Sequence, residues 1–233
     1  MIAICDYGMG NLRSVEKALA RVDSEAARVT DPEVARDADG LIVPGVGAFP
    51  EAMSRIRARG FDDVVSERAA AGVPVLGICL GMQLIFGSST ELKGAEGLGL
   101  LEGNVTDLDA KGGKVPHMGW SPVTWAKPSP LTEGLGDEEP FYFVHSLASR
   151  PGDDADVLGT AEYGERFAAA VERDNVFGVQ FHPEKSSAAG LRLLSNFAAI
   201  CGQALTSAPL RSASDKPPPR RDSAPLRSAS QPA

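Results

Sequence analysis

The feature that most constrains this chain is a regular alternation of short apolar runs with longer amphipathic segments. Three apolar runs are expected to be buried strands: IAIC at 2–5, GLIVP at 40–44 and VPVLGIC at 73–79. Three segments between them have helical periodicity: 11–22, 50–60 and 61–72. Strands that alternate with helices in this way form a parallel sheet covered on both faces. The sequence therefore predicts an α/β fold with a doubly wound, mostly parallel sheet.

The ends of these helices carry start and stop signals. Asn11 is a suitable N-cap, and Pro50 is a suitable first helical residue. Gly60 and Gly72 stand where helices commonly end, because glycine readily adopts the left-handed conformation found just after a helix. These four residues predict where the helices begin and end.

The second half of the chain has a different pattern. Residues 103–160 are rich in Gly, Pro and short β-prone pieces, which predicts extra strands in an antiparallel arrangement. Two further strands are expected at 167–173 and 176–182, because Asp174-Asn175 between them is a hairpin turn signal. A closing helix is expected over 186–205. Its apolar stripe is Leu191, Leu194, Phe197, Ala198 and Cys201.

The chain divides into a folded domain over 1–205 and a tail over 206–233. The tail repeats SAPLRSAS at 207–214 and 223–230, and it contains almost no large apolar residues. Such a segment buries too little surface to offset the entropy lost on ordering, so it is predicted to be disordered. An extension without function and a tether with weak electrostatic contacts are both open interpretations.

Charge and composition exclude several classes of function. The net charge is −8; the tail carries five basic and two acidic residues, so the body is at −11, which argues against binding nucleic acid. No apolar run is long enough for a membrane span, and the N-terminus shows no signal peptide. Three widely spaced cysteines fit a reducing cytosol. Metal-binding motifs are lacking, so no metal or cofactor is expected.

The segment 77-GICLG-81 places a cysteine between two glycines where a strand meets a helix. In a Gly-x-nucleophile-x-Gly turn the backbone of the central residue is strained, and a Cβ on either flank would clash. The N-terminus of the following helix would also favour a thiolate at Cys79. Two interpretations are open from these five residues: a nucleophile, or an inert cysteine packed under a helix.

A nucleophilic cysteine needs a base, and the base needs an orienting group. The segment 178-GVQFHPEKS-186 offers both, with His182 at the end of a strand-like run and Glu184 two residues later. In an extended chain these two side chains project to the same side. Alone, such a pair is better explained as two polar residues on the surface. Its position at a strand end favours a site, because sites in parallel sheets lie beyond the carboxyl ends of the strands.

The loop in 43-VPGVGAFPEAM-53 joins a strand to a helix. Its glycines, Gly45 and Gly47, allow backbone N–H groups to be exposed. Together with the N–H of Leu80, one of these groups is suited to bind an oxyanion. A phosphate-binding loop is a rival interpretation. Neither GK[ST] nor a full GxGxxG is present to support it.

GICLGMQ together with QFHPEKS resembles the class I, or triad, glutamine amidotransferase family. Further segments resemble one branch of that family, the glutaminase subunits that serve histidine biosynthesis. These segments are DYGMGNLRSV, PGVGAF, PHMGW and FYFVHS, and the resemblance extends from residue 1 to about 203. The tail is not explained by the resemblance.

The resemblance implies roles for individual residues. Cys79 would attack the carboxamide of glutamine, His182 would transfer protons, and Glu184 would orient His182. The oxyanion hole would comprise backbone of Leu80 and of the loop residues Gly45, Val46 and Gly47, which the partner would rearrange into a competent form. The implied substrate-binding residues are Gln83, Glu91, His145 and Ser146.

The resemblance also implies a partner. In this branch the glutaminase forms a heterodimer with a (β/α)8-barrel cyclase subunit, through whose interior ammonia travels. The implied interface residues are Tyr7, Asn11, Met118, Trp120, Tyr142 and Lys185. For Trp120 and Tyr142, ordinary core packing is the alternative, although both residue types are common interface anchors.

Three other functions compete with this one. Another amidotransferase of the same class, feeding anthranilate, pyridoxal phosphate or CTP synthesis, is disfavoured by PGVGAF and PHMGW. A non-catalytic module descended from a glutaminase would be expected to lack part of the triad. A free-standing cysteine hydrolase would keep the triad and need no partner, so dependence on a cyclase separates it from the leading hypothesis.

Overall fold

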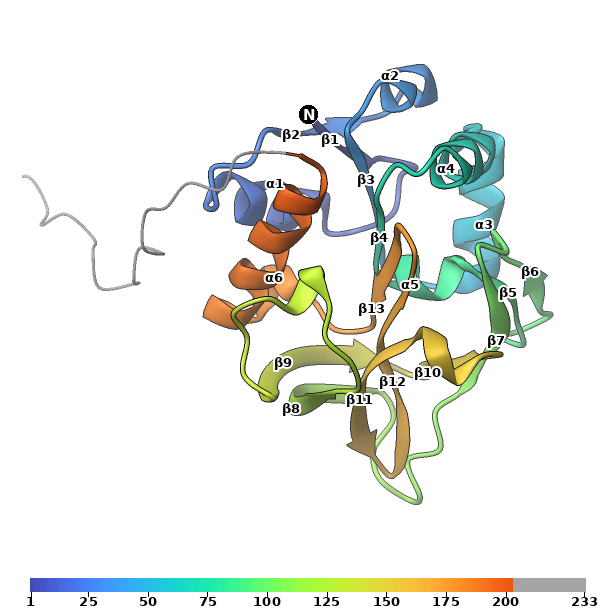
Figure 1. Cartoon of the computed structure of the whole chain (residues 1–233). Helices are drawn as coiled ribbons and strands as arrows, with labels where there is room; N and C mark the ends of the chain where they lie inside the picture. Colours follow the sequence, from blue (N-terminus) through green and yellow to red (C-terminus); the bar gives the residue numbers. More distant parts are fainter. Residues whose placement is uncertain (203–233) are drawn as a thin grey trace, which may run out of the picture.

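The computed structural model describes residues 1–202, so the predictions for the tail and for 203–205 lie outside the described part. Nine strands form the larger sheet in the order β2-β1-β3-β4-β13-β12-β11-β8-β9 (Figure 1). Five of them are parallel: β1 (Ile2–Cys5), β2 (Ala26–Val29), β3 (Gly40–Gly45), β4 (Val75–Cys79) and β13 (Val176–Val179). The predicted α/β class is confirmed.

Helices cover both faces of this parallel half (Figure 1). One face carries α1 (Leu12–Ala20) and α6 (Ser187–Ile200), and the other carries α2 (Pro32–Arg36), α3 (Phe49–Ala58) and α4 (Phe61–Ala70). Strand β1 shows why: Ile2 and Ile4 belong to the core under α1 and α6, whereas Ala3 and Cys5 belong to the opposite core. A strand that is buried on both faces has a continuous run of apolar residues, as IAIC does in β1.

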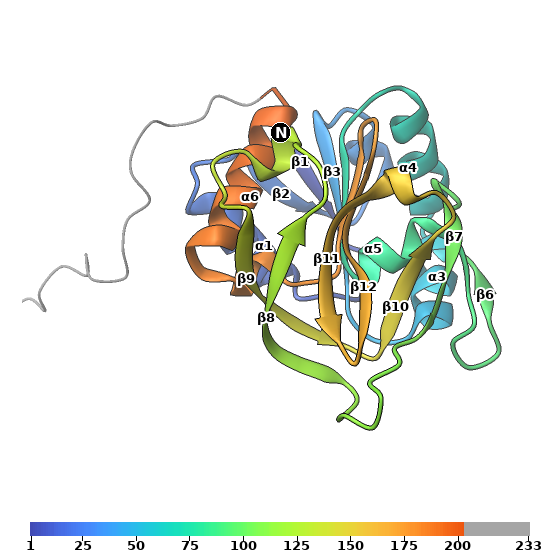
Figure 2. The same ribbon diagram turned by 60° about the horizontal axis from the view of Figure 1, so that its bottom comes forward.

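The remaining strands are antiparallel, apart from one pair. In the larger sheet they are β8 (His117–Trp125), β9 (Glu138–His145), β11 (Val157–Tyr163) and β12 (Glu165–Arg173). A smaller sheet has the order β10-β7-β5-β6, made of β5 (Phe86–Ser89), β6 (Ala95–Glu96), β7 (Leu101–Asp107) and β10 (Leu147–Pro151). Only its β5–β7 pair is parallel. Figure 2 brings β8, β9, β11 and β12 forward.

The predicted helix signals hold with small changes. Asn11 occupies the N-cap position of α1 without a side-chain capping hydrogen bond, and Pro50 is the second residue of α3. Gly60 and Gly72 follow their helices with φ of 72° and 82°, as the left-handed cap requires. The hairpin between β12 and β13 turns at Asp174, whose φ is 52°.

Strands β2, β5 and β6 and helix α2 were not predicted. Strand β2 has no run of large apolar residues, β6 has only two residues, and α2 has only five, too few for a periodic pattern. Three 3₁₀ turns complete the fold: η1 (Pro130–Thr132), η2 (Asp154–Asp156) and η3 (Pro183–Lys185). In the part of the chain that the structure describes, none of the helices has the length and apolar character needed to cross a membrane.

The topology gathers three strand ends at one edge. Strand β4 lies between β3 and β13, with Gly45 paired to Cys79 in register. The chain that leaves β13 at Val179 reaches His182 three residues later. The carboxyl ends of parallel strands are where α/β sheets place their ligands, so this edge is where a site is expected.

Candidate active site

Cys79 lies on a sharp turn between β4 and α5 (Leu80–Leu84), with φ of 55° and ψ of −111°. A positive φ at a non-glycine residue is strained, and such strain is typical of nucleophile turns. A Cβ added at Gly77 would lie 2.6 Å from the Gly81 carbonyl oxygen, and one at Gly81 would overlap the carbonyl oxygen of Val43. The turn therefore requires glycine on both sides of the cysteine, as the sequence predicted.

The helix after Cys79 is shorter than the sequence suggested. Helix α5 has five residues, Leu80–Leu84, and is followed directly by β5. The partial charge at a helix N-terminus arises from aligned peptide dipoles, so five residues supply little of it. The expectation that the helix dipole favours a thiolate at Cys79 is therefore weakened.

His182 and Glu184 form the predicted pair, with Nδ1 and Oε1 2.9 Å apart and both side chains only 1% exposed. Burial alone would lower the pKa of His182. The nearby Cys79 sulfur and the hydrogen bond to Glu184 together outweigh burial and raise that pKa to about 9. The imidazole is therefore set up to carry a positive charge between a sulfur and a carboxylate.

The route to this pair differs from the predicted one. His182 has extended backbone angles, but Pro183 starts the 3₁₀ turn η3, which contains Glu184. The carboxylate thus reaches the imidazole because the chain turns, and the extended-chain argument is wrong. Strand β9 holds the turn in place, since His182 N–H donates to the Tyr142 carbonyl at 2.9 Å and Tyr142 N–H donates to Ser186 Oγ at 3.0 Å.

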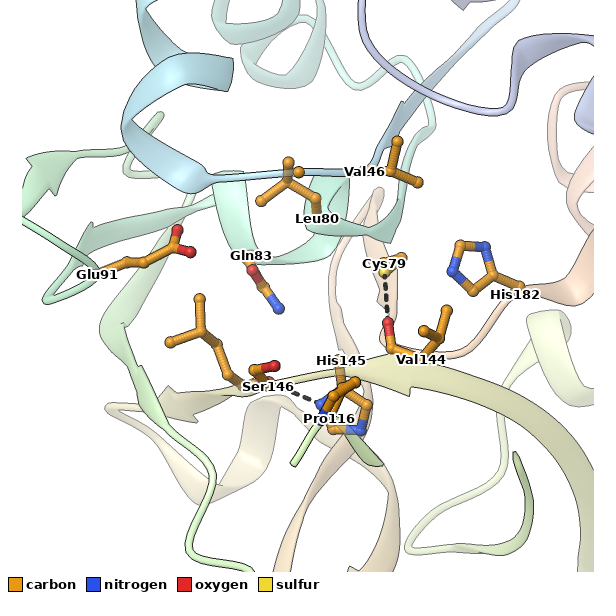
Figure 3. A pocket seen from close by; sticks show the side chains of 12 residues that line it. Val46, Cys79, Leu80, Gln83, Glu91, Pro116, Val144, His145, Ser146 and His182 are labelled. Atoms are coloured by element: carbon orange, nitrogen blue, oxygen red, sulfur yellow. Dashed lines mark hydrogen bonds between the residues drawn. The ribbon is translucent and has the colours of Figure 1, made fainter. Parts of the chain in front are cut away.

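The Cys79 sulfur has two hydrogen-bonding neighbours. The thiol lies 3.9 Å from the Val144 carbonyl oxygen, and Gln180 Nε2 donates to the sulfur at 3.7 Å. The imidazole of His182 faces the sulfur (Figure 3). Its Nε2 has no hydrogen-bond partner among residues 1–202, so it is free to take or give a proton.

A pocket of about 320 Å³ opens beside the sulfur, within the size range of small-molecule sites. Its lining includes the four predicted substrate-binding residues, which Figure 3 shows around the cavity. These residues are Gln83, Glu91, His145 and Ser146. Residues far apart in the sequence therefore meet at one cavity with the cysteine.

Two of these residues are already engaged by the protein. Glu91 Oε2 accepts a hydrogen bond of 2.5 Å from Phe49 N–H, the first residue of α3, while Gln83 Nε2 donates to Gln180 Oε1 at 3.0 Å. The carboxylate of Glu91 occupies the place that a phosphate would take at that helix N-terminus. This arrangement disfavours the rival phosphate-loop interpretation of residues 44–48.

His145 belongs to a buried hydrogen-bonded chain. Its Nδ1 lies 2.7 Å from the Leu147 carbonyl, and its Nε2 lies 2.9 Å from His117 Nδ1, whose Nε2 lies 2.9 Å from Ser121 Oγ. The carbonyl only accepts, so every proton in the chain is directed toward Leu147. Burial lowers the pKa of His145 to about 4, so the ring is neutral and acts as a pocket wall.

The predicted oxyanion loop is only partly at the pocket. Val46, Gly47 and Leu80 line the cavity, whereas Gly45 is buried at the end of β3 and is not among the lining residues. A hydrogen bond fixes the start of the loop, because Tyr7 Oη donates to the Pro44 carbonyl at 2.5 Å.

The predicted interface residues divide into two groups. Met118 and Trp120 are 63% and 53% exposed, so core packing does not explain them. Trp120 meets the Tyr142 ring edge-on at 6.1 Å, and Lys185 Nζ lies 5.9 Å from the centre of that ring.

Asn11 is partly exposed. Tyr7 is 0% exposed and cannot present its ring to a partner in this structure, so the prediction of a direct contact by Tyr7 is corrected. Its hydroxyl supports the oxyanion loop instead.

Gln180, Val144, His117 and Ser121 were not predicted as parts of the site. Gln180 had a signal, since it is an amide inside the otherwise apolar run 176-VFGVQF-181. Val144 acts through its carbonyl, which no residue pattern reveals. Within residues 1–202 no three His, Cys, Asp or Glu side chains are grouped closely enough to hold a metal ion.

Comparison with known proteins agrees with this geometry. The family model of glutamine amidotransferase class-I matches residues 3–201. "Imidazole glycerol phosphate synthase subunit HisH" of Moorella thermoacetica is 50% identical, with 84% of this chain and 93% of that relative covered. A relative of the same name from Syntrophotalea carbinolica is 47% identical, covering 84% and 98%. A crystal structure of a glutamine amidotransferase matches with TM-score 0.69 at 25% identity, over 86% of this chain and 98% of that one.

Proposed function

Because this chain belongs to the class-I glutamine amidotransferase family, we propose that it is the glutaminase subunit of imidazole glycerol phosphate synthase. It is an enzyme of histidine biosynthesis that takes ammonia from glutamine. The observation that carries the proposal is the convergence of Cys79, His182 and Glu184 at one pocket of a class-I chain. Their roles in the reaction are inferred from the geometry described above.

The first half of the reaction forms a thioester. The Cys79 thiolate attacks the carboxamide carbon of glutamine, and the carbonyl oxygen becomes an oxyanion. His182 holds the proton taken from the thiol and gives it from Nε2 to the departing nitrogen, so ammonia leaves and the γ-glutamyl thioester remains. Glu184 stabilises the charged imidazole throughout, which agrees with the raised pKa of His182.

The second half returns the enzyme to its starting state. His182, now neutral, takes a proton from water, and the hydroxide attacks the thioester carbon. The tetrahedral intermediate collapses with release of the thiolate, and glutamate leaves. In both halves we assign oxyanion binding to backbone N–H groups of Leu80 and of Val46 or Gly47, which line the pocket next to the sulfur.

Substrate recognition is assigned to the far side of the pocket. Glu91 Oε2 is committed to the N-terminus of α3, which leaves Oε1 to accept from the α-ammonium of glutamine. Ser146 is exposed at the pocket and offers a hydroxyl to the α-carboxylate, and Gln83 lies between these groups and the nucleophile. His145 is neutral and limits the depth of the pocket.

Ammonia released into water would be protonated and lost, so we infer a partner that receives it. The partner is the (β/α)8-barrel cyclase subunit, in a heterodimer. Exposed Met118 and Trp120, with Tyr142 and Lys185 beside them, supply the aromatic, apolar and cationic groups common at interfaces. We assign the complex to the cytoplasm, in keeping with three free cysteines.

The test is glutamate release from glutamine by the full chain alone, with the cyclase subunit, and with cyclase plus its nucleotide substrate. Cys79→Ala is the inactive control, and Cys201→Ala is the matched control, because burial raises the pKa of Cys201 to about 12 and keeps that thiol unreactive. We expect strong stimulation by the partner, abolished in Cys79→Ala and retained in Cys201→Ala.

Other outcomes would support different functions. Full activity without the cyclase would point to a free-standing cysteine hydrolase. If glutamate release does not depend on Cys79 under any of the three conditions, a non-catalytic module is the better explanation.

A further inference from the structure

Gln180 is a fully buried residue whose side-chain amide contacts the Cys79 sulfur. It follows β13, and its backbone N–H donates to the Ala169 carbonyl at 2.8 Å, which fixes the main chain. The residue is 0% exposed. A buried primary amide is costly unless its oxygen and nitrogen find partners, so the partners of Gln180 indicate what the residue is for.

Both ends of the amide point to functional groups. Its Oε1 accepts from Gln83 Nε2 at 3.0 Å, and its Nε2 donates to the Cys79 sulfur at 3.7 Å. Gln83 lines the substrate pocket. The amide thus connects a pocket residue to the nucleophile through two hydrogen bonds.

The orientation of this amide matters for the charge on the sulfur. A thiolate only accepts hydrogen bonds, so the carbonyl end of Gln180 would repel it, whereas the NH₂ end stabilises it. The bond from Gln83 engages the oxygen of Gln180 and therefore turns the nitrogen toward the sulfur. The other hydrogen-bonding neighbour of the sulfur, the Val144 carbonyl, can accept only from the neutral thiol.

We propose that Gln180 is a positioning residue that holds the Cys79 thiolate, and that Gln83 sets the orientation of its amide. The inference deepens the proposed function and rests on it for its catalytic consequence. The α5 helix is too short to stabilise a thiolate strongly, so a side-chain donor that reaches the sulfur supplies stabilisation that the helix does not. During attack the sulfur loses its charge to the new carbon–sulfur bond, and the hydrogen bond from Gln180 relaxes.

The test is the pH dependence of Cys79 alkylation by iodoacetamide in the full-length chain. Variants Gln180→Met and Gln180→Leu both remove the donor but differ in shape. Hydrogen bonds to charged groups are worth about a tenfold population change or more. We therefore expect both variants to shift the alkylation midpoint upward by about one pH unit, and kcat in the complex with the cyclase to fall about tenfold with KM little changed.

A matched control is Asn196→Leu. Asn196 is also a buried amide, bound to the Leu131 and Glu133 carbonyls, but it lies on α6 outside the pocket. Its loss is expected to lower the melting temperature without moving the alkylation midpoint. Gln83→Met tests the coupling: if Gln83 acts through Gln180, the double variant will have the midpoint of Gln180→Met alone.

The outcomes separate this inference from the proposed function. Unchanged alkylation midpoints in folded Gln180→Met and Gln180→Leu overturn the inference. It is also overturned if the two variants have different midpoints and the difference follows their melting temperatures, because the shift then reports lost stability and not the lost donor. Alkylation needs no turnover, so it reads the Gln180–Cys79 contact even if the wild type releases no glutamate. That last result would overturn only the proposed function.

Discussion

At the scale of single residues, the proposed chemistry depends on one positive charge, on His182, placed between two groups that can be negative, Glu184 and the Cys79 sulfur. Glu184 and the Cys79 sulfur oppose the effect of burial on His182, and the result is a pKa of about 9. Within residues 1–202, Cys5 and Cys201 do not face a His–Glu pair of this kind. Burial raises the pKa of Cys5 and of Cys201 to about 12, so their thiols stay protonated and unreactive. The site is therefore distinguished by the groups around the sulfur, since all three cysteines are buried.

The first prediction concerns Glu184→Gln. The amide keeps the size and a hydrogen-bond acceptor for His182 Nδ1 but removes the charge, so the pKa of His182 should fall and less thiolate should form at neutral pH. We expect kcat of the complex to drop by about 10² to 10⁴, the range of a lost general acid–base contribution. Steady-state glutaminase assays check this, with Glu172→Gln, whose carboxylate lies outside the pocket, as control. Equal activity of Glu184→Gln and wild type would contradict the role of Glu184.

At the scale of elements, two walls of the pocket come from the turn between β4 and α5 and from strand β9, which pairs with β8. The turn brings backbone of Gly81 against Val43 of β3, which leaves no room for a side chain. The strands place His117 opposite His145 in register, so their rings meet in the buried chain that ends at Leu147. Each wall depends on a close approach between elements that are distant in the sequence.

The second prediction is that Gly81→Ala prevents stable folding of the site. The added Cβ overlaps the Val43 carbonyl oxygen, a backbone atom inside the sheet, so the cost should exceed about 3 kcal/mol. Thermal unfolding measures it. Gly99→Ala is the control, because φ there is 67° and a Cβ would meet no atom of residues 1–202 within 4 Å. That variant should lose only about 1 kcal/mol, the cost of a left-handed backbone; similar losses in both variants would refute the steric account.

The third prediction concerns pH and stability. The folded pKa of His145 is about 4, below the unfolded value of 6.5, so protons favour the unfolded state. Stability from neutral His145 is therefore complete above pH 6.5 and is lost as the pH falls toward 4. His145→Asn keeps a donor for the Leu147 carbonyl but does not titrate. Across that interval the wild type should lose up to about 3 kcal/mol more unfolding free energy than the variant.

Urea unfolding of both proteins at several pH values between 7 and 4 gives the difference curve directly. Carboxylates titrate equally in the two proteins and cancel in the difference. Parallel curves would show that His145 is not held neutral by burial.

At the scale of the whole molecule, the catalytic edge of the sheet and the exposed aromatic surface adjoin each other. Strand β9 provides Val144 beside the nucleophile and Tyr142 beside Trp120, while η3 provides Glu184 inside and Lys185 outside. A partner seated on the outer residues would thus contact the same two elements that hold the triad. Because of this continuity, we expect the proposed partner to influence the glutaminase site.

The fourth prediction tests that surface. Trp120→Ala should weaken binding of the cyclase subunit at least about tenfold, as expected for an exposed aromatic side chain that becomes buried when the partner binds. Val34→Ala is the control, because Val34 is an exposed apolar residue on α2, remote from the catalytic edge. Calorimetric titration measures both affinities. If the two variants bind equally well, the partner docks elsewhere.

The sequence by itself determined the fold class and the family, and it singled out Cys79, His182 and Glu184 as the triad that we propose. Apolar runs such as 2–5 and 73–79 report strands buried on both faces, and that burial is a local property of composition. The flanking glycines of Cys79 are also local, because a strained turn limits which residues fit within five positions. The order of strands, however, is not written in any one segment.

Only the tertiary structure decided which groups meet across that order. It buried Tyr7 under the Pro44 carbonyl, committed Glu91 to the N-terminus of α3, and left Gly45 away from the pocket. It also brought Gln180 between Gln83 and Cys79 and directed the His117–His145 chain toward Leu147. These contacts join residues across different strands and loops, and several use backbone carbonyls that every residue possesses. Residue patterns therefore do not specify these partners, although the amide of Gln180 inside an apolar run is itself visible in the sequence, and only the tertiary arrangement decides which groups meet.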